Sequence, residues 1–92
     1  MEINASQTPQ FRRGFRLQWE EAQNCHVMLY PEGMAKLNGS AAEILLLLDG
    51  KRTLGEIIAE LNTRFPGVPD LGNDVTDFFG QAYEQKWIIF RD

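Results

Sequence analysis

Apolar and polar residues alternate along two stretches in the first half of the chain. Residues 15–19 place Phe, Leu and Trp on one side of an extended chain, and residues 26–30 are rich in strand-forming side chains. A period of two with one apolar face predicts a half-buried strand. The sequence Tyr-Pro-Glu-Gly at residues 30–33 suits a tight turn. A short third strand over residues 33–37 is therefore expected to complete an antiparallel meander.

The next part of the chain has helical spacing in two segments. Residues 40–48 are apolar nearly all round, which predicts a helix that other elements cover on most sides. Asn38 and Ser40 are both candidates for its N-cap. Residues 53–65 carry a single apolar stripe, and Thr53 begins a capping-box sequence.

A third helix is predicted over residues 73–86, and the apolar residues 87–90 form either a last strand or the tail of that helix. Residues 1–10 are polar and lack a period, so they are predicted to be a flexible N-terminal arm before a single domain over residues 11–92. Three strands followed by three helices predict an α+β fold. This order is typical of winged helix-turn-helix domains.

The composition fits one small soluble domain. The chain has 92 residues, 43% of them hydrophobic, and a single cysteine, Cys25, which excludes an internal disulfide framework and fits a reducing compartment. No apolar run approaches the roughly 18–20 residues that cross a bilayer. Residues 1–10 also lack the basic residues of a signal peptide. The expected location is the cytoplasm, with no membrane partner.

Candidate chemical groups are few. Cys25 and His26 are adjacent, so in a strand their side chains point to opposite faces and cannot readily share a metal ion. Acidic residues at turns and helix starts are explained by capping, and the sequence has no glycine-rich phosphate loop. The sequence therefore predicts no catalytic residue, no metal site and no cofactor.

The winged-helix order makes nucleic-acid binding the alternative function. In that mode the third helix enters the major groove, where phosphates attract basic side chains. Residues 38–92 hold five basic and nine acidic residues and so carry the whole net charge of −4. The third helix has Asp74, Asp77 and Glu84 against Lys86 alone, which disfavours a nucleic-acid partner. A structural subunit, such as a homodimer formed through a free sheet edge, is a third hypothesis.

The remaining features indicate peptide binding. The third strand ends the meander, and an edge strand exposes main-chain groups with which an extended peptide can pair. Its residues are Gly33, Met34, Ala35, Lys36 and Leu37. A proline at Ala35 is expected to impair peptide binding more than folding.

The third helix would form the second wall of a groove, with Phe78, Phe79 or Tyr83 as apolar anchors. Phe78 and Phe79 are adjacent and therefore about 100° apart on the helix, so at least one of them is expected in the core.

Five segments follow one another in a familiar order and spacing: Arg13-Gly-Phe-Arg-Leu17, Tyr30-Pro-Glu-Gly33, Leu37-Asn-Gly-Ser-Ala-Ala-Glu-Ile-Leu45, Asp49-Gly-Lys-Arg-Thr53 and Asp74-Val75. Together they resemble the pyrroloquinoline quinone (PQQ) biosynthesis protein D family, PqqD. The resemblance covers residues 8–90. The family usually has a glycine near Lys86, and this chain departs from the pattern there.

The resemblance implies a peptide chaperone without catalysis of its own. Such a protein binds the ribosomally made PQQ precursor peptide and presents it to a radical S-adenosylmethionine (SAM) enzyme. In the family's recognition domains, the leader segment adds as a strand beside the third strand and contacts the third helix. On this chain, that implies residues 33–37 and the outward face of residues 74–83, beginning with Asp74. A second surface, for the enzyme, is expected among basic side chains: Arg12, Arg13, Arg16, Lys51 and Arg52.

Overall fold

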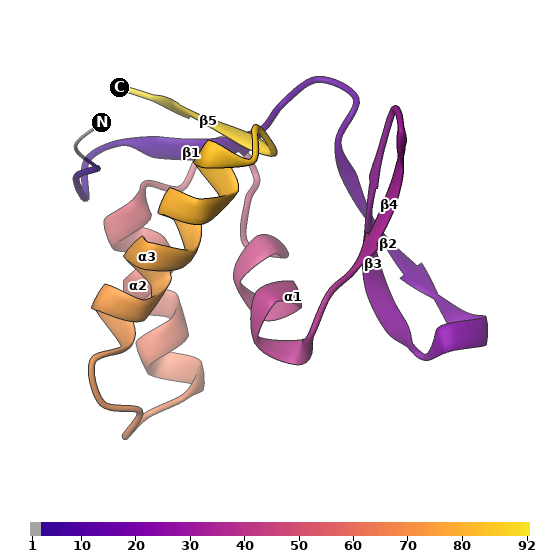
Figure 1. The fold of residues 1–92 in the computed structure, drawn as a ribbon. Coiled ribbons are helices and arrows are strands. Elements are labelled where there is room, and N and C mark those ends of the chain that lie inside the picture. The colour runs from indigo at the N-terminus through magenta and orange to yellow at the C-terminus, as the bar shows by residue number, and fades with distance from the viewer. Residues whose placement is uncertain (1–2) are drawn as a thin grey trace.

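The computed structural model describes residues 3–92 and has a mixed α and β fold (Figure 1). Its elements are β1 (Thr8–Phe11), β2 (Arg16–Glu20), the short 3-10 helix η1 (Glu21–Gln23), β3 (Cys25–Tyr30), β4 (Gly33–Lys36), α1 (Gly39–Leu45), α2 (Leu54–Arg64), α3 (Leu71–Glu84) and β5 (Ile88–Arg91). The α+β class predicted from the sequence is confirmed, with antiparallel strands and three α-helices in this part of the chain. Within residues 3–92, no helix combines the length and apolar character needed to cross a membrane.

The predicted three-stranded meander is present, with the strand order β2-β3-β4. Leu17 pairs with Met28, which pairs in turn with Ala35, so these three side chains share one face of the sheet. Leu17 and Met28 pack into the hydrophobic core from this face. Tyr30 lies opposite Gly33 across a two-residue turn. Among the described strands β4 has one neighbour, β3, so it is an edge strand, as predicted.

A second, two-stranded sheet pairs β1 with β5, with Pro9 opposite Phe90. Gln7 and Thr8 are buried, and the Leu54 N–H donates to the Gln7 carbonyl at 2.8 Å. The prediction of a flexible arm over residues 1–10 is therefore wrong from Gln7 onward, because Gln7 bonds to the start of α2 and the residues after it pair with β5. Residues 1 and 2 of that arm lie outside the described residues.

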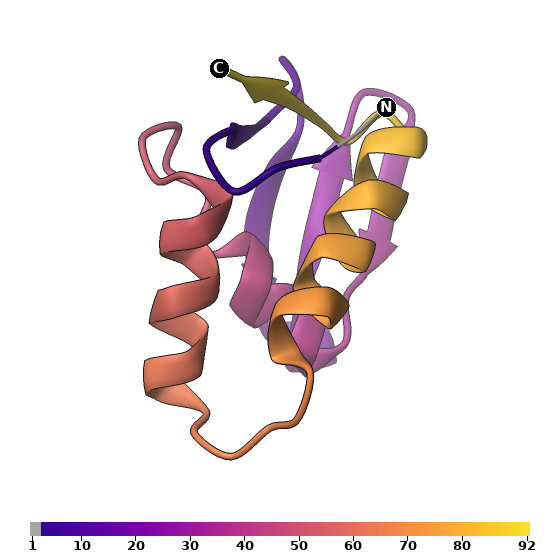
Figure 2. The same cartoon turned by 90° about the vertical axis from the view of Figure 1, so that its left-hand side faces the viewer.

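The helices cover the inner face of the meander. Helices α2 and α3 lie side by side, α1 lies between them and the meander, and the β1–β5 pair crosses one end of the helices (Figure 1 and Figure 2). Completely buried side chains come from every layer: Met28, Leu45, Leu54, Ile57, Leu61, Val75, Phe79 and Ile88. One continuous core therefore joins the helices to both sheets.

Two helix starts follow the capping signals in the sequence. At α1, the Asn38 side chain accepts the Ala41 N–H at 2.8 Å, so Asn38 rather than Ser40 is the N-cap. At α2, the predicted capping box is present. The Thr53 hydroxyl accepts the Glu56 N–H at 3.2 Å, and the Glu56 carboxylate accepts the Thr53 N–H at 2.8 Å. These bonds satisfy main-chain donors that the first helical turn leaves free.

A Schellman motif closes the turn between α3 and β5. The Lys86 N–H donates to the Tyr83 carbonyl and the Trp87 N–H to the Ala82 carbonyl, both at 3.0 Å. This motif places the residue after the C-cap in the left-handed region, which favours glycine. Lys86 occupies that position with a φ of 67°. The departure from the family's glycine therefore leaves the turn intact and puts the strain on Lys86.

Lys86→Gly is expected to raise the free energy of unfolding by about 1 kcal/mol, because a left-handed conformation costs a residue with a side chain roughly that amount. Urea denaturation followed by circular dichroism measures the change. Gln85→Gly is the matched control, since its φ of −80° is ordinary for a helix and glycine there should destabilise. Stabilisation by both changes, or by neither, would contradict the assignment of strain to Lys86.

Candidate functional site

The outer edge of β4 presents main-chain groups that face no other strand in the described part of the chain. The Leu37 N–H donates to a carbonyl of β3 at 3.1 Å, so Leu37 directs its main-chain groups toward β3. In an antiparallel ladder this direction alternates along the strand, so Ala35 and Gly33 also face β3. Met34 and Lys36 therefore direct their N–H and C=O groups away from the meander. An added strand would bond to these groups.

The direction of these bonds corrects the expectation for a proline at Ala35. The main chain of Ala35 faces β3, where its partner is Met28. Proline there would remove a hydrogen bond inside the meander and so would impair folding itself. A proline test of strand addition belongs at Met34 or Lys36 instead.

The side chains of the predicted strand site fall on two faces. Met34, with 46% of its surface exposed, and Lys36 lie on the outer face, whereas Ala35 is half-buried on the inner face. Gly33 is exposed at the turn. Leu37 is buried in the core and its N–H already bonds to β3, so its inclusion in the peptide site is wrong.

Two of the predicted residues on α3 share one side of the helix. Asp74 is exposed and Phe78 is half-buried. They are four positions apart, which separates them by about 40° around the helix. A Cβ added at Gly72 would lie 3.6 Å from Ile58 Cγ2, so the Gly72 flank of α3 faces α2. Asp74 and Phe78 therefore lie on the flank that is turned away from α2.

The other two aromatic residues lie elsewhere. Phe79 is completely buried, so the expectation that it anchors a peptide is wrong and Phe79 is the core member of the adjacent pair. Tyr83 is about 180° around the helix from Asp74. Its ring packs against Phe90 of β5 with the ring centroids 5.7 Å apart. The candidate site on α3 is therefore reduced to Asp74 and Phe78.

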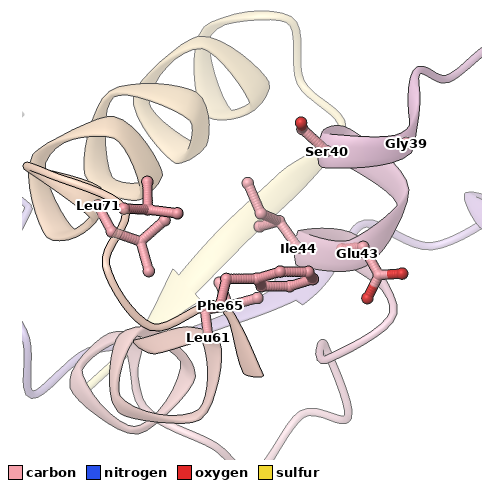
Figure 3. A pocket seen from close by; sticks show the side chains of 8 residues that line it. Gly39, Ser40, Glu43, Ile44, Leu61, Phe65 and Leu71 are labelled. Atoms are coloured by element: carbon pink, nitrogen blue, oxygen red, sulfur yellow. The ribbon is translucent and has the colours of Figure 1, made fainter. Parts of the chain in front are cut away.

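A cavity of about 350 Å³ lies where the start of α1, the end of α2 and the start of α3 meet (Figure 3). Its walls are mainly apolar and come from all three helices and the α2–α3 loop: Gly39, Ser40, Glu43, Ile44, Leu61, Phe65, Val68 and Leu71. Phe65 and Val68 are partly exposed there. The sequence analysis missed this site, although a valine between the two prolines of the α2–α3 loop is a signal that could have drawn attention to it.

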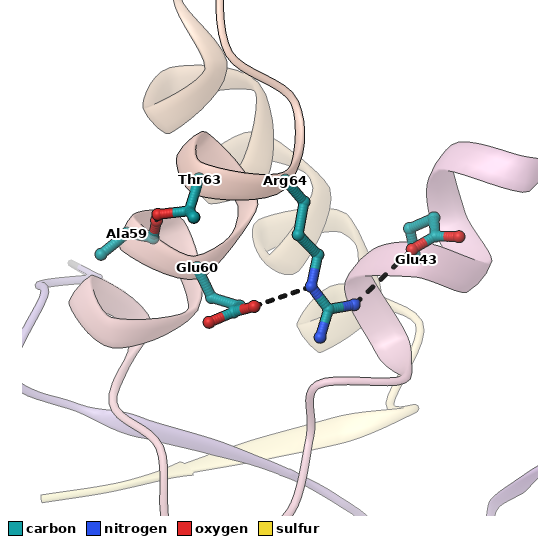
Figure 4. Close-up of polar contacts among 5 residues, drawn as sticks. All are labelled: Glu43, Ala59, Glu60, Thr63 and Arg64. Atoms are coloured by element: carbon teal, nitrogen blue, oxygen red, sulfur yellow. Dashed lines mark hydrogen bonds and ion pairs between the residues drawn. The ribbon is translucent and has the colours of Figure 1, made fainter.

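Glu43, which lines the cavity, belongs to a small group of charged side chains (Figure 4). The Arg64 guanidinium contacts the Glu60 carboxylate at 2.7 Å and the Glu43 carboxylate at 3.9 Å. All three side chains are well exposed to solvent, so these ion pairs stabilise the fold little. Glu43 and Glu60 nevertheless share one guanidinium, so carboxylates outnumber the cation in this group.

The basic residues predicted to meet a partner enzyme lie on separate connections. Arg12 and Arg13 are exposed between β1 and β2. Lys51 and Arg52 follow α1, and their N–H groups donate to the Asp49 carboxylate at 2.9 and 2.8 Å. These bonds, first that from Arg52 and then that from Lys51, lower the pKa of Asp49 below its ordinary value of 3.8. The ionised carboxylate therefore holds this basic turn in place.

Arg16 lies on β2 itself, with an exposed side chain. It pairs with Leu29 across the meander, on the outer face that also carries Lys36 and Met34.

The Cys25–His26 pair packs as ordinary strand residues. Both side chains are half-buried, and the His26 ring meets the edge of Trp19 with centroids 5.1 Å apart. Within residues 3–92, no three His, Cys, Asp or Glu side chains lie close enough together to hold a metal ion.

Comparison with known proteins gives consistent matches over most of the chain. Residues 25–88 match the family described as coenzyme PQQ synthesis protein D (PqqD). A PqqA binding protein of Rahnella aquatilis is 60% identical over 90 residues, which are 98% of this chain and 95% of the relative. A PqqA binding protein of Stutzerimonas stutzeri (strain A1501) is 54% identical over 90 residues, 98% of each chain.

The fold also matches a solved structure with a TM-score of 0.78 and 27% identity, over 96% of this chain and 95% of the other. That solution NMR structure is the PqqD truncation of Methylobacterium extorquens PqqCD, a stand-alone recognition element for ribosomally synthesized and post-translationally modified peptides. The fold is thus that of a small α+β recognition element. The chain belongs to the PqqD family.

Proposed function

We propose that this protein binds the precursor peptide PqqA in PQQ biosynthesis, by adding it as a strand to β4, and presents it to a radical SAM enzyme. Two relatives that are 60% and 54% identical are named PqqA binding proteins, and they support the peptide partner. The outward main-chain groups of Met34 and Lys36 carry the proposal for the binding mode. The bound peptide would gain main-chain hydrogen bonds from β4 and selectivity from its side chains.

The second wall of the proposed groove is the flank of α3 with Asp74 and Phe78. Phe78 offers a half-buried apolar ring and Asp74 an exposed carboxylate beside it. Because α3 and the meander are held by one core, the two walls keep a fixed spacing. A peptide strand could therefore bind between the two walls without breaking hydrogen bonds or contacts within the protein.

The remaining expectations form part of the same proposal. The protein would act in the cytoplasm as a chaperone, without catalysis of its own, on a winged-helix-like scaffold. The enzyme would contact the basic residues outside the peptide groove: Arg12, Arg13, Arg16, Lys51 and Arg52. Guanidinium and ammonium groups at that surface suit an acidic patch on the enzyme.

Lys36→Pro is expected to weaken PqqA binding about tenfold, because it removes an outward N–H and leaves a peptide carbonyl without its partner. Isothermal titration calorimetry with synthetic PqqA measures the dissociation constant. The residue before the proline stays extended, as proline requires.

Lys36→Ala is the matched control, since it removes the same side chain and keeps the N–H. Its affinity is expected to stay within about twofold of the wild type, the usual range for a single exposed contact. Equal weakening by the two variants would assign the effect to the side chain, and unchanged binding by a folded Lys36→Pro variant would end the proposal of strand addition at β4.

A further inference from the structure

We infer that the cavity between α1, α2 and α3 receives an apolar side chain of the bound peptide, followed or preceded by a basic residue. The inference rests on the proposed function, because it assigns the cavity to the peptide segment that runs past the Lys36 end of β4. It adds a selectivity site to the side-chain contacts already proposed at Asp74 and Phe78.

Position in the fold is the first argument, since both walls of the proposed groove end at this cavity. Gly39 and Ser40 line it, and they follow Lys36 by three and four residues. Leu71 lines it from the other side. Leu71, Asp74 and Phe78 have the spacing i, i+3 and i+7, so they form one stripe along α3. A peptide that lies between β4 and this stripe reaches the cavity in either chain direction.

The chemistry of the walls is the second argument. Ile44, Leu61 and Phe65 line the cavity from α1 and the end of α2 (Figure 3). Two lining side chains remain open to solvent, Phe65 with 39% and Val68 with 43% of their surfaces exposed. Apolar surface left open around a hollow is stabilised when another apolar group covers it. A volume of about 350 Å³ is near the lower end of the roughly 300–1,000 Å³ typical of ligand sites, which suits one or two side chains.

Charge near the cavity is the third argument. Glu43 lines the cavity, and Glu43 and Glu60 share the single guanidinium of Arg64 (Figure 4). Asp70 and Asp74 are exposed and lie one residue before and three residues after Leu71 in the chain. Carboxylates outnumber the cation in the segments next to the cavity, so a lysine or arginine beside the inserted side chain would be attracted there and an acidic residue repelled.

Val68→Glu is the decisive variant. It lies in an exposed loop, so the fold tolerates the change, and it places a carboxylate where the inserted apolar side chain would cover it. Burying that unpaired charge costs more free energy than attraction to an exposed basic neighbour returns, because exposed ion pairs contribute little. Leu46→Glu is the matched control, because Leu46 is 49% exposed, equally apolar and outside the cavity lining. With synthetic PqqA in calorimetry, Val68→Glu is expected to bind about tenfold more weakly than the wild type, and Leu46→Glu within about twofold of it.

Amide chemical-shift mapping separates this inference from the proposed function. If wild-type protein and PqqA give no shifts at Met34 and Lys36, strand addition fails and the cavity assignment fails with it. If those shifts appear and Val68→Glu binds like the wild type, the cavity assignment alone is overturned.

The basic neighbour has its own test. Glu43→Gln is expected to weaken PqqA binding about threefold at low salt and less at high salt. No change at either salt concentration would overturn the charge preference. A second copy of the chain is the other possible occupant of the cavity, and sedimentation of the free protein tests for it. Self-association that Val68→Glu abolishes would assign the cavity to that second copy and overturn the inference.

Discussion

Phe79→Ala is expected to lower the free energy of unfolding by about 3–5 kcal/mol, the usual loss when a buried aromatic ring is removed from a core. Phe79 is completely buried and joins α3 to the other layers. Domains of this size are stable by only roughly 5–15 kcal/mol, so the variant would approach half-unfolding under mild conditions. Urea denaturation followed by tryptophan fluorescence measures the loss.

Phe78→Ala provides the matched control, because the same side chain is removed one position along the same helix. Phe78 is half-buried, so the loss in stability should be roughly 1–2 kcal/mol. This variant should instead weaken PqqA binding, since its ring lies on the flank that faces the proposed groove. A larger loss of stability at Phe78 than at Phe79 would mean that Phe78, and not Phe79, is on the side of α3 that faces the core.

Deletion of residues 1–11 is expected to lower the free energy of unfolding by about 3–5 kcal/mol, from lost hydrogen bonds and exposed apolar surface together. The deletion removes β1 from its pairing with β5. It also removes the carbonyls of Ala5 and Gln7, which accept the N–H groups of Gly55 and Leu54 at 3.0 and 2.8 Å. Thermal unfolding by calorimetry measures the loss, and amide hydrogen exchange should show it first in β5.

Ser6→Ala is the control within the same segment, because its side chain is exposed and its change should stay within about 0.5 kcal/mol. If the deletion left the melting temperature unchanged, residues 8–11 would be dispensable and the flexible arm predicted from the sequence would be restored. Hydrogen exchange in β5 as slow as in the full chain would lead to the same conclusion.

Local signals explain why much of the fold could be predicted from the sequence. The alternation over residues 15–19 and the turn at Pro31-Glu32 are each encoded within a few residues. The sequence therefore predicted β2, β3 and the turn correctly. The capping box at Thr53 is likewise a pattern of four residues. The pairing of Thr8 with Arg91 joins opposite ends of the chain, and no local pattern encodes that distance.

The candidate site was predicted less completely, because periodicity gives the spacing of residues and not the direction they face. Phe79 and Tyr83 have the right spacing for a helix face, but the core holds Phe79 and β5 holds the Tyr83 ring. The direction in which each residue of β4 points its N–H and C=O groups follows from the two-residue turn before the strand. It could therefore have been predicted from the sequence by counting positions from that turn. Counting from Gly33 places Ala35 inward and Lys36 outward.

The side-by-side pairing of β1 and β5 brings the two ends of the described chain to one corner of the molecule, and β4 lies on the opposite side (Figure 1). A module fused to either end would therefore emerge away from the edge that the peptide is proposed to use. Tethering the peptide or an enzyme through such a fusion would raise its local concentration without covering β4. The domain is thus suited to work equally well as a separate subunit or as one segment of a larger polypeptide.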